Sequence, residues 1–161
     1  MAKVVVVGGG FAGCAAAVSA AKSGAQTTLV ERTDMLLAGG IRAGRMNFEG
    51  KLVLAEEAKA LGAEDIFAAL ESIVLHRSNI IEEAHGYVYN TSLAEPTVRR
   101  TVEGAGVALR LEDRAVDVLR EGDRVLAVKL ESGDVLEGDS FVDCTGSTGG
   151  VSVCTAYGGG C

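Results

Sequence analysis

Residues 4–13 read VVVVGGGFAG, and this stretch decides the fold. Four β-branched residues in a row are typical of a parallel strand that is buried on both faces, so we predict a strand over Lys3–Val7. The glycines that follow, Gly8, Gly10 and Gly13, have the spacing G-x-G-x-x-G. The stiffest residue type is therefore followed at once by the most permissive one, which predicts a tight turn.

The segments on the far side of this turn predict a helix and a second strand. Phe11–Ser23 is rich in alanine, with Lys22 near its end and Gly24 placed to stop a helix. Gln26–Glu31 reads QTTLVE and is β-branched again, as a strand would be. A glycine turn within such a strand–helix–strand unit binds the pyrophosphate of a dinucleotide in many proteins.

Each glycine of the motif has its own predicted task. Gly8 permits the tight turn, Gly10 has no side chain to keep a pyrophosphate from the backbone, and Gly13 lets the helix pack closely on the strand. The start of the helix, with Phe11 and Ala12 in its first turn, offers N–H groups and a partial positive charge to the phosphates.

An acidic residue stands at the distance that the motif requires. Glu31 ends the second predicted strand, where a carboxylate can accept hydrogen bonds from ribose hydroxyls and would repel a 2′-phosphate. This disfavours NADP and leaves NAD and FAD as the candidate ligands. The alternative is a structural glycine turn with Glu31 as an ordinary charge at the end of a strand.

Composition and charge limit the partners. The chain has 161 residues, which suits one domain, and 48% of them are hydrophobic. A net charge of −7 argues against nucleic acid and anionic membranes as main partners. No apolar run is long enough to span a bilayer, and the N-terminus has no signal-peptide pattern. We therefore expect a cytoplasmic protein.

The cysteines and histidines do not predict a metal site within this chain. Reduced or ligand-bound thiols are expected in the cytoplasm rather than disulfides. Cys154 and Cys161 could join cysteines of a partner around an iron–sulfur cluster, but free thiols in an unstructured end are the favoured interpretation. His76 and His85 lack a Cys or carboxylate at metal-ligand spacing.

The middle of the chain predicts helices, so we expect a helical insertion at about 45–105. Apolar residues at three- and four-residue spacing indicate helices over Lys51–Ala63 and Glu64–Arg77, with Gly62 between them. A further helix is predicted from Glu95 to about Glu103, with a proline in its first turn. The alternation HGYVYNTS around residues 85–92 suits a strand.

The last third predicts an antiparallel meander and a short buried strand. Turn signals at Glu121-Gly122-Asp123 and Ser132-Gly133-Asp134 separate alternating segments. The predicted strands are Ala108–Leu119, Arg124–Glu131, Asp134–Leu136 and Ser140–Asp143.

A second glycine-rich stretch, LLAGGIRAG at 36–44, helps to choose between the two dinucleotides. An NAD-binding domain would normally begin its next crossover helix soon after the second strand. A flexible loop at Gly39 and Gly40 could instead let an isoalloxazine ring lie against the backbone, which favours FAD.

With these motifs in view, the chain resembles the N-terminal part of a flavoprotein of the glutathione-reductase-like superfamily. VVVVGGGFAGCAAAVSAAKSGAQTTLVERTDMLLAGG at 4–40 is similar to the FAD-dependent oxidoreductase family that includes fumarate-reductase-like proteins. FVDCTG at 141–146 resembles the family's second motif, with Cys144 in place of an alanine. The resemblance is faint between Met46 and Glu95.

The resemblance implies roles for individual residues. Gly8, Gly10 and Gly13 would hold the FAD pyrophosphate, and Glu31 would hold the adenosine ribose. The other implied contacts are Arg32 near the adenine, Gly39, Gly40 and Arg42 at the pyrophosphate or flavin, Ala115 at the adenine through its backbone, and Cys144, Thr145 and Gly146 beside the cofactor.

The predicted fold is α/β, a Rossmann-like parallel sheet with helices on both faces and an antiparallel β-meander. Residues 1–161 would be the N-terminal portion of an FAD-binding domain, completed by a second polypeptide or a C-terminal remainder. The expected function is oxidation or reduction of a small organic substrate, such as an amine, amino acid or hydroxy acid. The alternatives are a non-catalytic electron-transfer subunit that holds FAD and an NAD-binding enzyme. The sequence identifies no catalytic residue.

Overall fold

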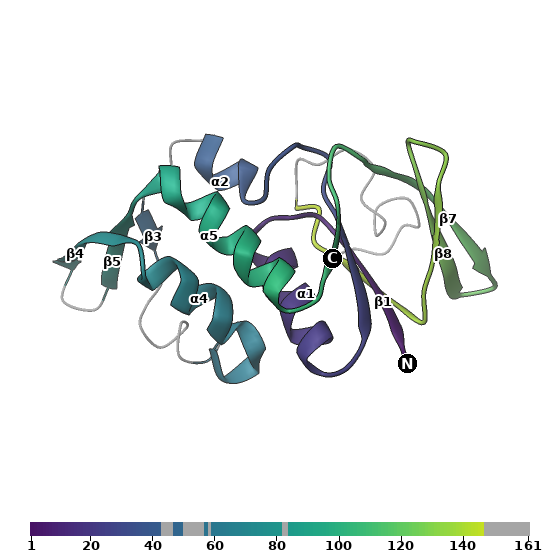
Figure 1. Cartoon of the computed structure of the whole chain (residues 1–161), viewed down its shortest axis with the longest axis horizontal. Helices are drawn as coiled ribbons and strands as arrows, with labels where there is room; N and C mark the ends of the chain where they lie inside the picture. Colours follow the sequence, from purple (N-terminus) through teal and green to yellow (C-terminus); the bar gives the residue numbers. More distant parts are fainter. Residues whose placement is uncertain (43–46, 50–56, 58, 82–83, 147–161) are drawn as a thin grey trace.

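The computed structural model describes residues 1–42, 47–49, 57, 59–81 and 84–146 (Figure 1). The predictions for Cys154 and Cys161, and most of the predicted helix from Lys51, lie outside these residues.

A four-stranded parallel sheet forms the centre of the molecule, in the order β10-β1-β2-β6. The first strand runs parallel to both of its neighbours, with Val5 opposite Thr28 on one side and Phe141 on the other. The predicted strand–helix–strand unit and the last predicted strand are confirmed. The elements are β1 (Lys3–Val7), α1 (Phe11–Lys22), β2 (Gln26–Val30), β6 (Ala108–Arg110) and β10 (Ser140–Asp143).

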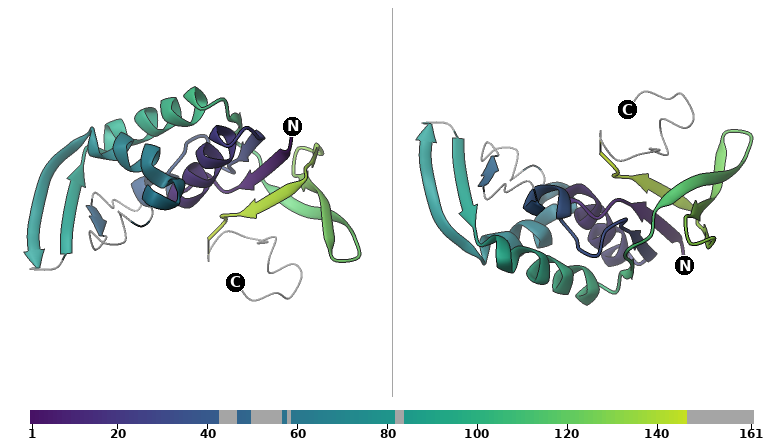
Figure 2. Two further views of the ribbon diagram at one scale, coloured as in Figure 1. Left: turned by 90° about the horizontal axis from the view of Figure 1, so that it is seen from below. Right: turned by 90° about the horizontal axis from the view of Figure 1, so that it is seen from above.

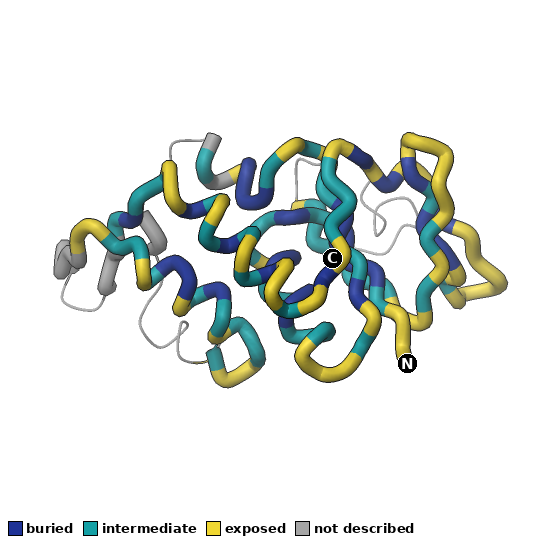
Figure 3. The backbone as a smooth tube through the Cα atoms, viewed as in Figure 1, coloured by how far each residue is buried: buried dark blue, intermediate teal, exposed yellow. Residues whose placement is uncertain are grey.

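The two faces of this sheet have different covers (Figure 2). Val6 and Leu29 pack into one core with residues of the helices, whereas Val5, Val7 and Val30 pack into a second core with residues of the meander. Figure 3 shows the buried positions of both cores along the central strands. The α/β class is therefore confirmed. The expectation of helices on both faces is wrong for the described residues, because the meander covers the second face.

The meander begins later than predicted. Its strands are β7 (Ala115–Glu121), β8 (Arg124–Leu130) and β9 (Val135–Glu137), in the order β7-β8-β9. The predicted strand Ala108–Leu119 is wrong as one element, because its first part is β6 of the parallel sheet. Between the two parts Glu112 has a φ of +55°, which breaks the extended chain. Alternation of apolar residues cannot show that a strand changes its partner.

The insertion contains a second antiparallel sheet as well as helices. The strands β3 (Asn47–Glu49), β4 (Val74–Ile81) and β5 (Ala84–Tyr89) pair in the order β3-β5-β4 and lie at the end of the molecule opposite the meander (Figure 1). A π-helical turn, η1 (Lys59–Ala63), precedes α4 (Glu64–Glu71). The predicted continuation of α4 to Arg77 is wrong, because the chain pairs with β5 from Val74 onward.

The last helix of the insertion, α5 (Thr91–Gly104), begins four residues before the predicted start at Glu95. The side chain of Asn90 caps it by accepting a hydrogen bond from the N–H of Ser92 at 3.0 Å. Its buried residues Ala94, Val98 and Val102 belong to the helical core. Residues of α1, α4 and α5 thus form one hydrophobic core with Val6 and Leu29 of the parallel sheet.

Candidate functional site

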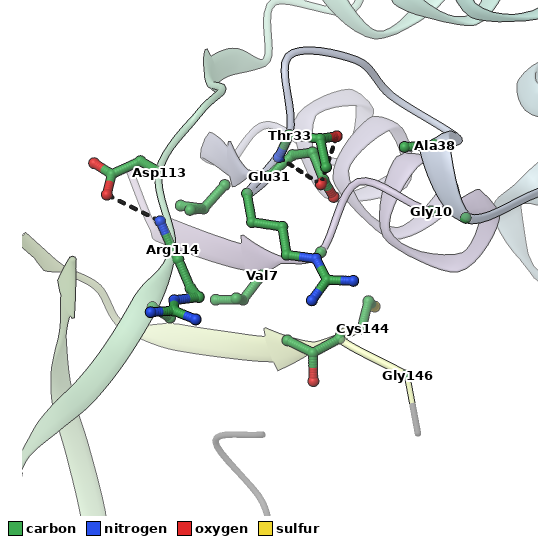
Figure 4. A pocket seen from close by; sticks show the side chains of 15 residues that line it. Val7, Gly10, Glu31, Thr33, Ala38, Asp113, Arg114, Cys144 and Gly146 are labelled. Atoms are coloured by element: carbon green, nitrogen blue, oxygen red, sulfur yellow. Dashed lines mark hydrogen bonds between the residues drawn. The ribbon is translucent and has the colours of Figure 1, made fainter. Parts of the chain in front are cut away.

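A pocket of about 370 Å³ opens where β1, β2 and β10 end and β7 begins. Carboxyl ends of parallel strands are the usual place for a ligand in an open α/β sheet. In Figure 4 the pocket runs from Gly10 and Ala38 at one end to Asp113 and Arg114 at the other, with Glu31 between. The lining residues are Val7, Gly8, Gly10, Val30, Glu31, Arg32, Thr33, Ala38, Gly39, Asp113, Arg114, Ala115, Cys144, Thr145 and Gly146.

Two glycines of the motif are required by the packing of the protein itself. Gly8 has a φ of +106°, and a Cβ there would stand 2.4 Å from the carbonyl oxygen of Cys144. A Cβ on Gly13 would stand 1.7 Å from the carbonyl oxygen of Gly8. These distances are far below a van der Waals contact. The turn can therefore approach the end of β10 only because position 8 has no side chain, and α1 can approach the turn only because position 13 has none.

Gly10 differs from these two glycines because it faces the pocket. Among the described residues, no atom beyond Gly10 and its chain neighbours lies within 4 Å of the place where its Cβ would be. It is the N-cap residue of α1, and the first N–H groups of an α-helix have no partner within the helix. Open space thus lies directly beside a helix N-terminus, which is the kind of place where proteins bind phosphate groups.

Gly9 is a structurally constrained position that the sequence motif did not single out. Its Cβ would stand 2.8 Å from Cδ2 of Leu36 and 2.9 Å from Cβ of Glu31. Its N–H donates to Oε2 of Glu31 at 2.7 Å, and its carbonyl accepts from the N–H of Leu37 at 2.8 Å. Gly9 therefore connects the turn both to the acid of β2 and to the segment that leads into α2 (Ala38–Arg42).

The carboxylate of Glu31 is held in place by the protein (Figure 4). Besides the bond from Gly9, its Oε1 accepts from the N–H of Thr33 at 2.9 Å and from the Thr33 hydroxyl at 2.9 Å. A carboxylate has about four lone-pair sites, so three donors leave it able to accept from a ligand. Glu31 is thus an oriented acceptor at the wall of the pocket.

Asp113 is a buried acid at the other end of the pocket, with 8% of its surface exposed. Its carboxylate accepts from the N–H and hydroxyl of Ser132 and from the N–H of Arg114, and Arg110 lies 3.7 Å away. Burial favours the neutral form, but the bonds from Ser132 and Arg114 outweigh it, so the pKa of Asp113 is lowered. Asp113 therefore carries its charge at neutral pH.

Two cysteines lie close to the glycine turn. Cys14 is fully buried, and its thiol donates to the carbonyl of Gly9 at 3.4 Å. Burial, with a smaller effect of the Glu31 charge, raises the pKa of Cys14 to about 12. Burial followed by the charge of Asp143 also raises the pKa of Cys144, which lines the pocket. Both thiols are protonated at neutral pH and act here as small packing residues.

The pocket brings together nine of the predicted site residues: Gly8, Gly10, Glu31, Arg32, Gly39, Ala115, Cys144, Thr145 and Gly146. Gly13 lies beneath the turn, while Phe11 and Ala12 line a separate apolar pocket with residues of α4. The loop predicted around Gly39 and Gly40 is instead the short helix α2, and the side chain of Arg42 lies outside what the structure describes.

Sequence reasoning missed six lining residues: Val7, Val30, Thr33, Ala38, Asp113 and Arg114. Val7 is the last residue of one predicted strand and Val30 the last but one of the other, so their place near the carboxyl edge could have been inferred. No sequence pattern marks Asp113 and Arg114 as pocket residues. They reach the pocket because the chain leaves β6, which pairs with β2, and enters β7, which pairs with β8.

Two further properties concern only the described part of the chain. No cluster of three or more His, Cys, Asp or Glu side chains there could hold a metal ion. Within the same ranges, every helix is too short or too polar to span a bilayer.

The family model of the FAD dependent oxidoreductases matches residues 3–152. The match includes both the glycine turn and β10, the strand that ends at Asp143. The chain therefore belongs to the FAD-dependent oxidoreductase family, a family of enzymes whose cofactor is FAD.

Solved structures share the fold at low sequence identity. Thermovibrio ammonificans THI4 is 20% identical with a TM-score of 0.68, over 98% of this chain and 63% of its own. Aquifex aeolicus GidA is 18% identical with a TM-score of 0.68, over 87% of this chain and 24% of its own. P. aeruginosa PqsL, in complex with 2-aminobenzoylacetate, is 18% identical with a TM-score of 0.63, over 97% of this chain and 45% of its own. The chain thus spans less than two thirds of each of these proteins.

Proposed function

We propose that this chain is the FAD-binding part of a flavoenzyme that oxidises or reduces a small organic substrate. The observation that carries the proposal is Gly10, which leaves open space beside the N-terminus of α1 at the wall of the pocket. A backbone of this shape next to a helix N-terminus is suited to a diphosphate. The oriented carboxylate of Glu31 lies where a ribose attached to that diphosphate would be expected.

We assign successive parts of the ligand to the residues that line the pocket from the glycine turn to Asp113. The turn at Gly8–Gly10 and the start of α1 would bind the diphosphate, and Glu31 would accept from the ribose hydroxyls. The backbone at Ala115 would meet the adenine at the end of the pocket marked by Asp113 in Figure 4. Thr145 and Gly146 would lie along the β10 side.

FAD, when bound, supplies the redox chemistry, and the protein supplies binding, orientation and exclusion of water. Val7 and Val30 at the strand ends form an apolar floor in the pocket and keep water from that side of the ligand. No described residue is proposed as a general acid or base.

The substrate and the partners are open to experiment. An amine, an amino acid or a hydroxy acid is proposed, on the resemblance stated above. We also propose that polypeptide beyond these 161 residues completes the substrate side, since the chain covers only part of each matched structure. The proposed location is the cytoplasm.

The test is to titrate the purified chain with FAD and with NADH, and to record the visible spectrum and the intact mass of the native material. We expect FAD to bind in preference, and Glu31→Gln to weaken its binding by about 1–3 kcal/mol through the lost charged acceptor. Glu112→Gln is the matched control, because Glu112 is exposed and does not line the pocket.

Different outcomes separate the candidate functions. Unchanged FAD affinity in Glu31→Gln would contradict the assignment of the ribose site. A yellow protein that stays inert towards all three substrate classes with its full partner present would favour the electron-transfer subunit. Preference for NADH over FAD would favour the NAD-binding enzyme.

A further inference from the structure

The end of the pocket farthest from the glycine turn is built by a short crossing segment. Residues 111–114 connect β6 of the parallel sheet to β7 of the meander, and Asp113, Arg114 and Ala115 line the pocket there. The site therefore spans two sheets, and these sheets pack together through one core, with Val5, Val7 and Val30 on one side and Ala115, Val118, Val128 and Leu130 on the other. Apolar packing has no preferred direction. Polar contacts at the pocket are therefore needed to fix Glu31 and Ala115 relative to each other if both are to bind the same ligand.

On the side of the parallel sheet, backbone hydrogen bonds connect the crossing segment to β2 and the residues after it. The N–H of Glu31 donates to the carbonyl of Arg110 at 2.8 Å, and the N–H of Asp113 donates to the carbonyl of Glu31 at 3.2 Å. The N–H of Glu112 donates to the carbonyl of Thr33 at 2.9 Å. The crossing segment is thus tied directly to the residue proposed to hold the ribose.

On the side of the meander, the connection runs through a backbone hydrogen bond, from the N–H of Glu131 to the carbonyl of Arg114 at 2.8 Å, and through a side chain. The Asp113 carboxylate accepts from the Ser132 hydroxyl at 2.7 Å and from the Ser132 N–H at 3.2 Å. Ser132 lies in the turn between β8 and β9, and the same carboxylate accepts from the N–H of Arg114 at 2.9 Å. A buried carboxylate with several donors is held in one orientation, because losing any of them would leave a buried polar group unpaired.

We propose that Asp113 is a positioning residue that holds the adenine-contacting backbone at Ala115 in place relative to Glu31. Its N–H donates to the carbonyl of Glu31, the residue after β2, and its carboxylate accepts from the β8–β9 turn, so Asp113 connects the two walls of the adenosine end. The proposal rests on the proposed function, since it assumes that a ligand with an adenosine occupies the pocket.

The test compares Asp113→Ala with Asp113→Asn in the full chain, using ADP and FAD as probes and calorimetric titration well below the melting temperature. We expect Asp113→Ala to weaken both ligands about tenfold or more, by a similar factor, because the lost positioning affects the adenosine that they share. Asp113→Asn should stay within about threefold of the wild type. Its amide oxygen can still accept from both backbone N–H groups, and the Ser132 hydroxyl can reverse its hydrogen bond.

Asp123→Ala is the matched control, since this exposed acid lies in the turn between β7 and β8 and does not line the pocket. If Asp113→Ala does not fold, Ser132→Ala serves in its place, and a loss of about threefold for both probes is expected. A lower melting temperature with unchanged affinities would show a merely structural role and overturn the inference. So would weaker FAD binding with unchanged ADP binding. A wild-type chain that binds neither probe would refute the proposed function, and the inference with it.

Discussion

Glycine is found on both sides of the β1–α1 turn, but its surroundings differ between the two sides. On the inner side, Gly13 is pressed against the backbone of Gly8, so that the protein itself leaves no room for a methyl group. On the pocket side, Gly10 borders open space, and no neighbouring atom in the described part of the chain accounts for its lack of a side chain. The contrast teaches that one motif combines a requirement of folding with a requirement of ligand binding. Substitution can separate the two.

Gly13→Ala should have the largest effect, and it should act on stability. The added Cβ would stand 1.7 Å from the carbonyl oxygen of Gly8, so α1 must move away from the turn. We expect the free energy of unfolding to fall by at least about 3 kcal/mol, as overpacking against rigid backbone can cost. Urea denaturation measures it, and a loss below about 1 kcal/mol would contradict the close packing described here.

Gly10→Ala should have the next largest effect, and it should act on ligand binding. The methyl group meets no neighbouring atom of the described residues, so stability should fall by less than about 1 kcal/mol, the cost of alanine at an N-cap. FAD affinity should fall about tenfold or more, because the methyl group occupies the space proposed for the diphosphate. Fluorescence titration with FAD gives the affinity. Full affinity in this variant would remove the distinction between the two sides of the turn.

Gly24→Ala should have the smallest effect, and it tests whether a glycine outside the turn affects stability alone. Gly24 follows α1 with a φ of +88° and lies outside the pocket. Among the described residues, no atom beyond its chain neighbours lies within 4 Å of its Cβ position. Only backbone strain is added, so we expect a loss of about 1 kcal/mol in stability and no change in FAD affinity. Thermal denaturation with and without FAD measures both. A change in affinity here would mean that strain after α1 reaches the pocket.

Local chemistry made much of the first half of the site predictable. The valine run, the alanine-rich segment and Gly24 predict β1, α1 and its end from neighbouring residues alone, and the position of Glu31 follows from the length of β2. The glycine spacing likewise predicts the turn. These inferences succeeded because strand, turn and helix signals agree within a stretch of about thirty residues.

The errors arose where distant pairing decided the structure. Residues 74–77 continue a helical pattern in the sequence, yet they form a strand because β5 pairs with them. Ala108–Leu119 alternates throughout, but its first part joins β2 while its second part joins β8. The glycines at 39 and 40 suggested a loop, whereas the segment around them folds as α2.

The sequence by itself determined the parallel strand unit, the glycine turn and the acid that faces it, because each depends on residues close together in the chain. Only the tertiary structure decided that the meander rather than a helix covers the second face, and that Asp113 lies across the pocket from Gly10. These features depend on which strands find each other over long separations. Burial and hydrogen bonding of whole elements, not the preference of any single residue, make that choice.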